Sequence, residues 1–371
     1  MTTFRRSTRA AAAAGALAAA SALLTGTAEA ADTAWVKKPA PLMWPGATFE
    51  HAGAVSSSEV WAVGGQGTHS EQSSPFCLGG PPLCETWTTR NPAMQRWNGL
   101  YWRTHNPPGF TGRGAMTRVA VRSASDVWAG GYREDSRGWP ASSYVARWNG
   151  SAWTEVAPPA GQPGVSDLDV DGSGVWATGG GQVFRWDGSG WIRQDPPVEA
   201  ASLHVLADDD VWAAGRDKAT GKPGVARWNG SSWRLAPAPG GEAGETVADA
   251  AARSAEDVWL GLGKYPQQAT ALVRWDGAAW SPVALPSWVT TLTRVLPTGG
   301  GGALAVVEGV QGGTDGRQHL IRYDGSAWHV VPVAPTAPNV NGATLRSLVQ
   351  MPGTVWGVGT EGLRAAVVAP G

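Results

Sequence analysis

Apolar and polar residues alternate along this chain in short segments, a pattern that is typical of half-buried β-strands. Residues 116–122 alternate in this way, and further short apolar segments follow at 127–132, 143–148 and 152–156. The pair Pro158-Pro159 ends the group, because proline cannot donate a hydrogen bond to a strand ladder. These residues predict one four-stranded antiparallel sheet.

A hairpin signal joins the third and fourth of these strands. Arg147 and Trp148 precede Asn149-Gly150, and Trp153 follows. Asn-Gly and Asp-Gly sequences accept the positive φ angle that a tight hairpin turn requires. The same arrangement occurs six times, and its first aromatic residue is Trp97, Trp148, Trp186, Trp228, Trp275 or Tyr323.

A second motif, an apolar segment that ends in glycine, precedes each hairpin. It occurs seven times, once weakly at 303–306, and in the other copies it carries Trp61, Trp128, Trp176, Trp212, Trp259 or Trp356. Successive hairpins are 38 to 51 residues apart, which is the period of a four-stranded propeller blade. The sequence therefore predicts an all-β fold, a seven-bladed β-propeller with four antiparallel strands in each blade.

The fourth strand of the seventh blade has to come from the other end of the chain. Residues 362–368 supply a third strand, and no fourth strand follows them. Residues 34–41 align with residues 152–159, the fourth strand of an earlier blade. We therefore expect the N-terminal strand to complete the last blade and to cover an edge that could otherwise pair with another chain. Residues 31–371 then form a single propeller domain.

The repeat resembles the Kelch family and secreted bacterial propellers similar to the central domain of galactose oxidase. The resemblance rests on an apolar strand that ends in Gly130-Gly131, an aromatic strand with Trp148, a turn, and Trp153. It covers nearly all of residues 31–371 and implies the same propeller fold. The hairpin at 187–191 also resembles the Asp-box of sialidases, which is a structural turn, so this resemblance does not imply a sialidase.

The first thirty residues have the composition of a secretory signal peptide. Arg5, Arg6 and Arg9 form a basic start, residues 10–24 are apolar, and Ala28-Glu29-Ala30 is a small-x-small cleavage site. The Arg5-Arg6 pair leaves both the general and the twin-arginine export routes open. We expect a secreted, extracellular protein without a membrane span.

Charge and cysteine content narrow the possible partners. Residues 31–371 carry 26 basic and 29 acidic side chains, which makes nucleic acid a poor partner. Cys77 and Cys84 lie in one Gly- and Pro-rich stretch, and an exported chain favours a disulfide between them. A metal or thiol site there would have only His69 as a companion. We expect a monomer with no cofactor and no metal.

Eighteen of the 22 tryptophans occupy repeat positions. They could stack on carbohydrate, one site in each blade, or they could fill the wedge between neighbouring sheets. Their repetition in every blade favours packing. The repeated arginines are similarly expected to form structural ion pairs with the acid of the preceding motif, such as Asp126 or Asp257.

The other four tryptophans, Trp44, Trp87, Trp139 and Trp288, fall in long connections. In a propeller, the second-to-third and blade-to-blade connections share one face, which we name the long-loop face. The short turns lie on the opposite, short-turn face. Exposed aromatic rings bind sugar or peptide surfaces at low entropic cost, so these four are the candidate ligand-binding residues. Each of them could instead cap its own loop.

Signatures of catalysis are weak. The six histidines occur singly, which argues against the copper site of galactose oxidase. No carboxylate pair stands out for a glycosidase. The run at 167–172 lacks the closing glutamate of a calcium loop, and alternation on a strand explains it better. The innermost strands offer mixed charge without an obvious constellation, from Glu50, His51, Arg118, Arg122, Asp167, Asp169, His204, Asp249, Arg294 and Arg346.

Two hypotheses of different classes remain. The first is a secreted, non-catalytic module that recognises an extracellular glycan or protein through the long-loop face. The second is a secreted hydrolase or oxidase with its site at the mouth of the propeller. An enzyme should place several perturbed carboxylates or histidines in the central funnel, whereas a binder should place aromatic and neutral polar groups there. We expect the binder, with no catalytic residues.

Overall fold

The predicted sheet of blade 2 is present and paired in chain order. The computed structural model describes residues 34–72, 86–264, 268–311, 314–333 and 343–371. Every named element in these ranges is a β-strand, and no helix there is long and apolar enough to cross a membrane. The strands of blade 2 are β6 (Gly114–Ser123), β7 (Asp126–Glu134), β8 (Pro140–Trp148) and β9 (Trp153–Val156). The expected signal peptide at residues 1–30, Cys77 and Cys84 lie outside the described residues.

The other blades repeat this strand order. Blade 1 consists of β2 (Thr48–Ser56), β3 (Glu59–Gln72), β4 (Thr86–Trp97) and β5 (Trp102–His105). Blade 3 consists of β10 (Asp167–Asp171), β11 (Gly174–Gly179), β12 (Gln182–Trp186) and β13 (Trp191–Gln194). Blade 4 consists of β14 (Val198–Ala207), β15 (Asp210–Asp217), β16 (Pro223–Trp228) and β17 (Trp233–Leu235). Blade 5 consists of β18 (Glu245–Ser254), β19 (Asp257–Lys264), β20 (Gln268–Trp275) and β21 (Trp280–Val283). Blade 6 consists of β22 (Val289–Gly299), β23 (Gly302–Gln311), β24 (Thr314–Tyr323) and β25 (Trp328–Val331). Blade 7 consists of β26 (Thr344–Met351), β27 (Thr354–Glu361), β28 (Arg364–Pro370) and β1 (Trp35–Lys37).

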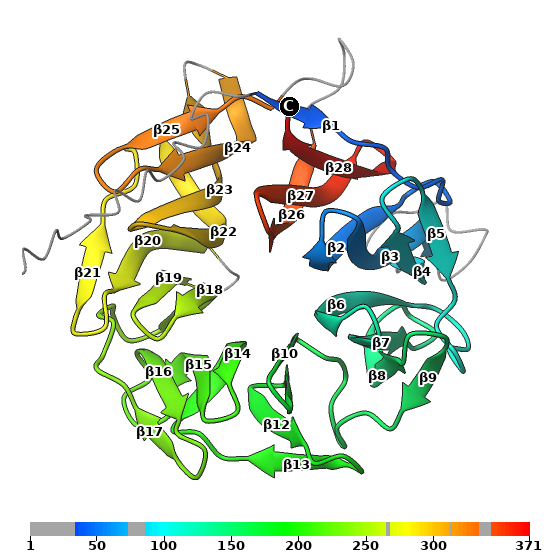
Figure 1. Ribbon diagram of the computed structural model, residues 1–371, viewed down its shortest axis with the longest axis horizontal. Helices are drawn as coiled ribbons and strands as arrows, with labels where there is room; N and C mark the ends of the chain where they lie inside the picture. The colour runs from blue at the N-terminus through cyan, green and yellow to red at the C-terminus, as the bar shows by residue number, and fades with distance from the viewer. Residues whose placement is uncertain (1–33, 73–85, 265–267, 312–313, 334–342) are drawn as a thin grey trace, which may run out of the picture. The chain divides into compact units, whose positions relative to one another are not determined.

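The first strand of each blade faces the centre of the propeller. These seven strands contact one another in a closed series, in which β2 contacts both β6 and β26. Figure 1 shows β6, β14, β18, β22 and β26 around a central space, with β5, β9, β13 and β17 at the outside. The seven-bladed propeller that the repeat predicts is confirmed.

The N-terminal strand closes the ring as expected. β1 pairs antiparallel with β28, so that Trp35 lies opposite Pro370 and Lys37 opposite Val368. Trp35 is only 4% exposed and packs in the core shared by blades 6 and 7. Lys37 adds an ion pair of 2.5 Å to Glu361. The predicted completion of the last blade is therefore confirmed.

The hairpin turns work differently from the tight turn that the Asn-Gly signal suggested. In blade 2, Trp148 pairs with Trp153, so the turn spans four residues. Oδ1 of Asn149 accepts hydrogen bonds from the backbone N–H groups of Ser151 (3.0 Å) and Ala152 (2.9 Å). Gly150 has a φ of 96°, a left-handed conformation that glycine adopts without steric cost. Asparagine thus serves as a hydrogen-bond acceptor, and glycine supplies the positive φ.

One expected long connection, residues 66–91, is partly regular structure. It contains an extension of β3 and β4, in which His69 pairs with Thr89 and Glu71 with Trp87. The prediction of an irregular loop is wrong for these paired residues, because polar segments pair through their backbones without leaving an apolar alternation in the sequence.

Candidate functional site

The tryptophans of the repeat pack between blades, as their repetition predicts. Trp61 of blade 1 is fully buried, and its ring lies 5.4 Å from that of Trp148 and 5.2 Å from that of Trp153 in blade 2. Trp128 of blade 2 contacts the equivalent pair of blade 3, Trp186 and Trp191. These rings fill the wedge between sheets, and Trp61 and Trp128 are too deeply buried to contact a ligand.

The repeated arginines also have structural partners. Nε of Arg96 donates to Glu59 at 2.8 Å, and its guanidinium lies 5.4 Å from the ring of Trp61. The indole N–H of Trp61 donates to the same carboxylate at 2.9 Å. Arg147 forms the predicted pair with Asp126 in blade 2, and Arg274 the predicted pair with Asp257 in blade 5. This acid–arginine–tryptophan unit holds the second and third strands together.

The four tryptophans outside the repeat divide into two exposed and two half-buried side chains. Trp44 is 62% exposed and Trp139 is 68% exposed. Trp87 is half-buried on the extended β4. Trp288 is half-buried at the edge of the core between blades 5 and 6, and its ring lies 5.0 Å from that of His319.

Three of these tryptophans lie beside the extension of β3 and β4. A Cβ atom added to Gly67 would lie 3.1 Å from Trp44, and one added to Gly138 would lie 3.2 Å from Trp87. Trp139 directly follows Gly138 in the chain. The structure thus brings Trp44, Trp87 and Trp139 to blades 1 and 2, whereas Trp288 stands apart, before β22.

A polar cluster on the same extension accompanies these rings. Nε2 of His69 lies 3.1 Å from Oε1 of Glu71, and Arg113 forms an ion pair with the same oxygen. Hydrogen bonds from Arg113 and His69 hold the pKa of Glu71 below its usual value. The hydroxyl of buried Thr89 lies 3.4 Å from the His69 ring. This surface therefore offers charged and hydrogen-bonding groups next to exposed indole rings.

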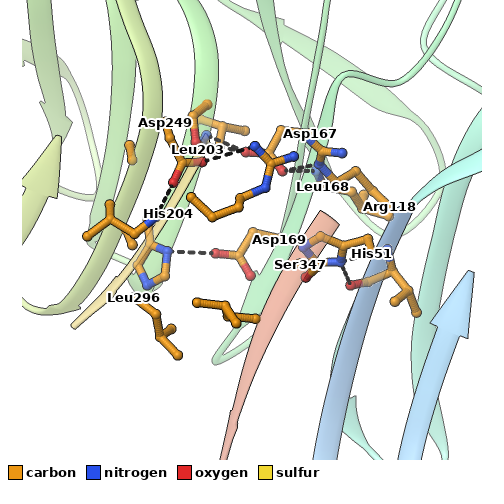
Figure 2. Close-up of a pocket in the computed structure, with 17 residues that line it drawn as sticks. His51, Arg118, Asp167, Leu168, Asp169, Leu203, His204, Asp249, Leu296 and Ser347 are labelled. Carbon is orange, nitrogen blue, oxygen red and sulfur yellow. Dashed lines mark hydrogen bonds and ion pairs between the residues drawn. The ribbon is translucent and has the colours of Figure 1, made fainter. Parts of the chain in front are cut away.

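The central funnel contains a cavity of about 200 Å³ to which all seven innermost strands contribute. At one level each blade supplies one polar side chain: His51, Arg118, Asp167, Ser202, Asp249, Arg294 and Ser347. Asp169 and His204 extend the lining from the next inward-facing position of β10 and β14. Figure 2 shows Arg118 and Asp249 on opposite sides of the cavity, with Asp169 and His204 facing each other across its lower part. The funnel residues that the sequence offered as unconnected charges thus form one constellation.

A β-bulge produces this ring in six of the seven blades. In β6 the pairing shifts between Met116 and Arg118, so Thr117 is an extra residue. The extra residue reverses the alternation, and Met116 is fully buried while Arg118 faces the cavity. The same shift precedes His51, Ser202, Asp249, Arg294 and Ser347.

Several cavity side chains also join one blade to the next. Oδ2 of Asp167 accepts the backbone N–H of Leu203 at 2.9 Å, and Oδ2 of Asp249 accepts that of Val295 at 2.7 Å. Nδ1 of His51 lies 3.1 Å from the carbonyl oxygen of Val119. These bonds give the charged residues of the funnel a structural partner on the neighbouring blade.

Burial in the funnel perturbs the ionisation of these groups. Desolvation, with the charge of Arg118 added, lowers the pKa of His51 to about 3. Desolvation raises the pKa of Asp249 to about 6 and also raises that of Asp169. Asp167 has the opposite shift, because Arg118 and the N–H of Leu203 outweigh its burial and lower its pKa.

The lowered pKa of His51 predicts that the folded protein loses stability in acid. The unfolded chain binds a proton on this histidine below about pH 6.5, whereas the folded protein resists protonation down to about pH 3. Stability should therefore fall as the pH decreases from 6.5 towards 3, and His51→Gln should remove about 2–3 kcal/mol of that loss at pH 4. Urea unfolding at pH 7 and pH 4 measures this difference. His69→Gln, at an exposed histidine, is the control, and an equally steep loss in His51→Gln would contradict the assignment.

The sequence identified most of the polar side chains that line the cavity but not their arrangement. Ser202 and Ser347 line the cavity and were not foreseen. Three expected funnel residues do not line it: Glu50, Arg122 and Arg346. Arg122 instead pairs with Asp126 and donates to the carbonyl oxygen of Gly174. The signal that was missed is the bulge, which leaves a buried apolar residue two positions before each inward polar one.

Residues 167–171 of the acidic run form strand β10, as their alternation indicates, and Gly172 begins the turn that follows. Leu168 and Val170 are buried, whereas Asp167 and Asp169 face the cavity and Asp171 is exposed. Among the residues that the structure describes, no group of three or more His, Cys, Asp or Glu side chains could hold a metal ion.

Comparisons with known proteins support the fold and no narrower assignment. No protein-family model and no curated protein matches the chain. The extracellular domain of BT4673 from B. thetaiotaomicron is 11% identical, with a TM-score of 0.55 over 90% of this chain and 39% of that one. PorZ, a surface component of the type-IX secretion system of Porphyromonas gingivalis, is 15% identical, with a TM-score of 0.54 over 90% of this chain and 48% of that one. The propeller domain of the Trilobed protease from Pyrococcus furiosus is 8% identical, with a TM-score of 0.52 over 88% and 95%. By these likenesses and its own strand pairing, the chain is a seven-bladed β-propeller.

Proposed function

We propose that this chain is a secreted, monomeric, non-catalytic binding module of Kelch-like repeats that recognises an extracellular glycan or protein through its long-loop face. The contrast among the tryptophans carries the proposal: the repeat tryptophan rings are packed between blades, while Trp44 and Trp139 stand 62% and 68% exposed. An exposed indole ring costs free energy in water unless a ligand covers it. Trp87 and the His69–Glu71–Arg113 cluster lie on the same extension and supply hydrogen bonds beside the rings.

Trp288 has a separate place in the proposal. It is half-buried near His319 and lies away from the extension of β3 and β4. We therefore propose that Trp288 makes no more than a secondary contact with the ligand, near blade 6. Its replacement should affect binding less than replacement of Trp44 or Trp139.

Replacement of the exposed rings tests the binding function. Trp44→Ala and Trp139→Ala should each weaken binding about tenfold or more, because central aromatic contacts dominate the binding free energy. The measurement is a screen of glycans, cell-wall fractions and secreted proteins, followed by titration of the best ligand. Tyr101→Ala is the matched control, since Tyr101 is an exposed aromatic residue (52%) in the short turn of blade 1. Unchanged affinity in both tryptophan variants would refute the long-loop surface.

The perturbed carboxylates favour the hydrolase as a second candidate. An enzyme was expected to place perturbed carboxylates in the funnel, whereas a binder was expected to place aromatic and neutral polar groups there. The raised pKa values of Asp249 and Asp169 agree better with the first expectation. Their backbone hydrogen bonds to neighbouring blades offer a structural explanation for the same residues. Turnover of the bound ligand that is lost in Asp249→Asn would establish the hydrolase, whereas binding without turnover would leave the module non-catalytic.

A further inference from the structure

Two arginines hold equivalent positions on opposite sides of the funnel cavity. Arg118 follows the bulge of β6, and Arg294 follows the bulge of β22. Nη1 of each donates to the carbonyl oxygen of its own bulge residue, at 2.9 Å to Thr117 and 2.6 Å to Thr293. Nε of each reaches the next blade, at 3.0 Å to Asp167 and 2.7 Å to the carbonyl oxygen of Arg346. Both guanidinium groups are therefore fixed in position by two bonds.

The remaining nitrogen of each guanidinium group is open to a further acceptor. Within the described ranges, no hydrogen bond involves Nη2 of Arg118 or Nη2 of Arg294. The side chains are 24% and 32% exposed, so a solute can reach them. A guanidinium group that is already fixed loses little entropy when it binds a carboxylate. The cavity thus presents two pre-organised donors for an anionic group.

The carboxylates of the cavity differ in how completely they are satisfied. Asp167 accepts bonds from Arg118, Ser202 and the N–H groups of Leu203 and Leu168, which occupy both oxygens. Among the described residues, Asp249 accepts only the N–H of Val295, and its ion pair with Arg294 is long, at 3.7 Å.

Asp169 resembles Asp249. It accepts two backbone N–H groups, and its ion-pair partner among the described residues is the imidazole of His204, at 3.7 Å. Burial raises the pKa of both carboxyl groups, which means that their negative charge is insufficiently compensated. An ammonium group placed between Asp169 and Asp249 would supply the missing compensation.

We propose that this cavity binds a small zwitterion of the α-amino acid class, with its carboxylate on Nη2 of Arg118 and Arg294 and its ammonium group on Asp169 and Asp249. The cavity of about 200 Å³ is large enough for such a molecule. With the histidines neutral, the lining carries two positive and three negative charges, so a bare anion is disfavoured. A bare cation would leave both Nη2 groups without an acceptor. Leu296 and Leu348 provide an apolar wall for the ligand side chain.

Calorimetric titration of the full-length protein with each of the twenty protein amino acids tests this site. At least one amino acid should bind with one-to-one stoichiometry. Its methyl ester, which lacks the carboxylate, and its N-acetyl derivative, which lacks the ammonium group, should each bind about tenfold more weakly or worse, because each loses charge-assisted hydrogen bonds. Failure of all twenty to bind, or equal affinity for either derivative, would overturn the proposal.

Variants separate this site from the long-loop surface. Asp249→Asn and Asp169→Asn keep the side-chain shape, and each should weaken amino acid binding about tenfold or more. The amide oxygen still accepts the one backbone N–H at Asp249, and it accepts one of the two at Asp169. Lys264→Gln is the control, because it removes an exposed charge from β19 outside the cavity. Trp44→Ala and Trp139→Ala should leave this affinity unchanged. Full affinity in both aspartate variants would refute the assigned ammonium site, and thermal unfolding verifies that each variant is folded.

Discussion

Replacement of Trp61 by alanine is expected to lower the free energy of unfolding by about 3–5 kcal/mol, the range for truncating a buried aromatic side chain. The indole ring is fully buried between blades 1 and 2, in contact with Trp148 and Trp153. Its removal leaves a cavity between two sheets and takes one donor from Glu59. Urea unfolding monitored by circular dichroism measures the change.

Trp139→Ala is the matched control for this variant. It removes the same side chain from a position that is 68% exposed, and it should change the unfolding free energy by less than about 0.5 kcal/mol. Equal destabilisation in the two variants would contradict the packing role of the repeat tryptophans. The pair also separates stability from binding, since only Trp139 belongs to the proposed ligand surface.

Deletion of residues 34–38 is expected to have a still larger effect, about 5–8 kcal/mol, because it removes a buried tryptophan together with several hydrogen bonds. Trp35 donates its backbone N–H to Pro332 at 2.7 Å, and Lys38 donates its own to Val367 at 2.9 Å. The deletion also uncovers the edge of β28, which can then pair with another chain. We expect a lower urea midpoint together with dimers or larger species in sedimentation.

Lys38→Ala tests whether these effects come from the strand itself. The substitution keeps the backbone N–H that bonds to Val367, so the protein should remain monomeric and nearly as stable as the original. A deletion variant that stayed monomeric and unfolded at the original urea concentration would show that β1 does not close the ring.

The fold was predictable because its determinants are local and repeated. Each Arg–aromatic–Asn/Asp–Gly segment specifies one hairpin, and the resemblance of residues 34–41 to 152–159 identified the closing strand. The tryptophans could be assigned to packing for the same reason, since a ligand site has no need to recur in every blade.

The cavity was less predictable because a bulge breaks the period-two pattern. Phe49 and His51, or Leu292 and Arg294, would share a face in a regular strand, yet the first of each pair is buried and the second lines the cavity. A sequence of mixed charges gives no sign of this reversal until the register is known. The extension of β3 and β4 was hidden for a related reason, because its pairing depends on backbone bonds between polar residues.

The pairing of β1 with β28 also constrains the order of folding. Lys37 and Glu361 are 324 residues apart, so their contact forms only after the ribosome has synthesised nearly all of this sequence. Blades 1 to 6 can form from neighbouring hairpins as they emerge, because their contacts are local. The seventh blade must wait, and until then its unpaired edge is exposed to other nascent chains. A polypeptide terminated before β28 would therefore keep an open ring and accumulate as an aggregation-prone species.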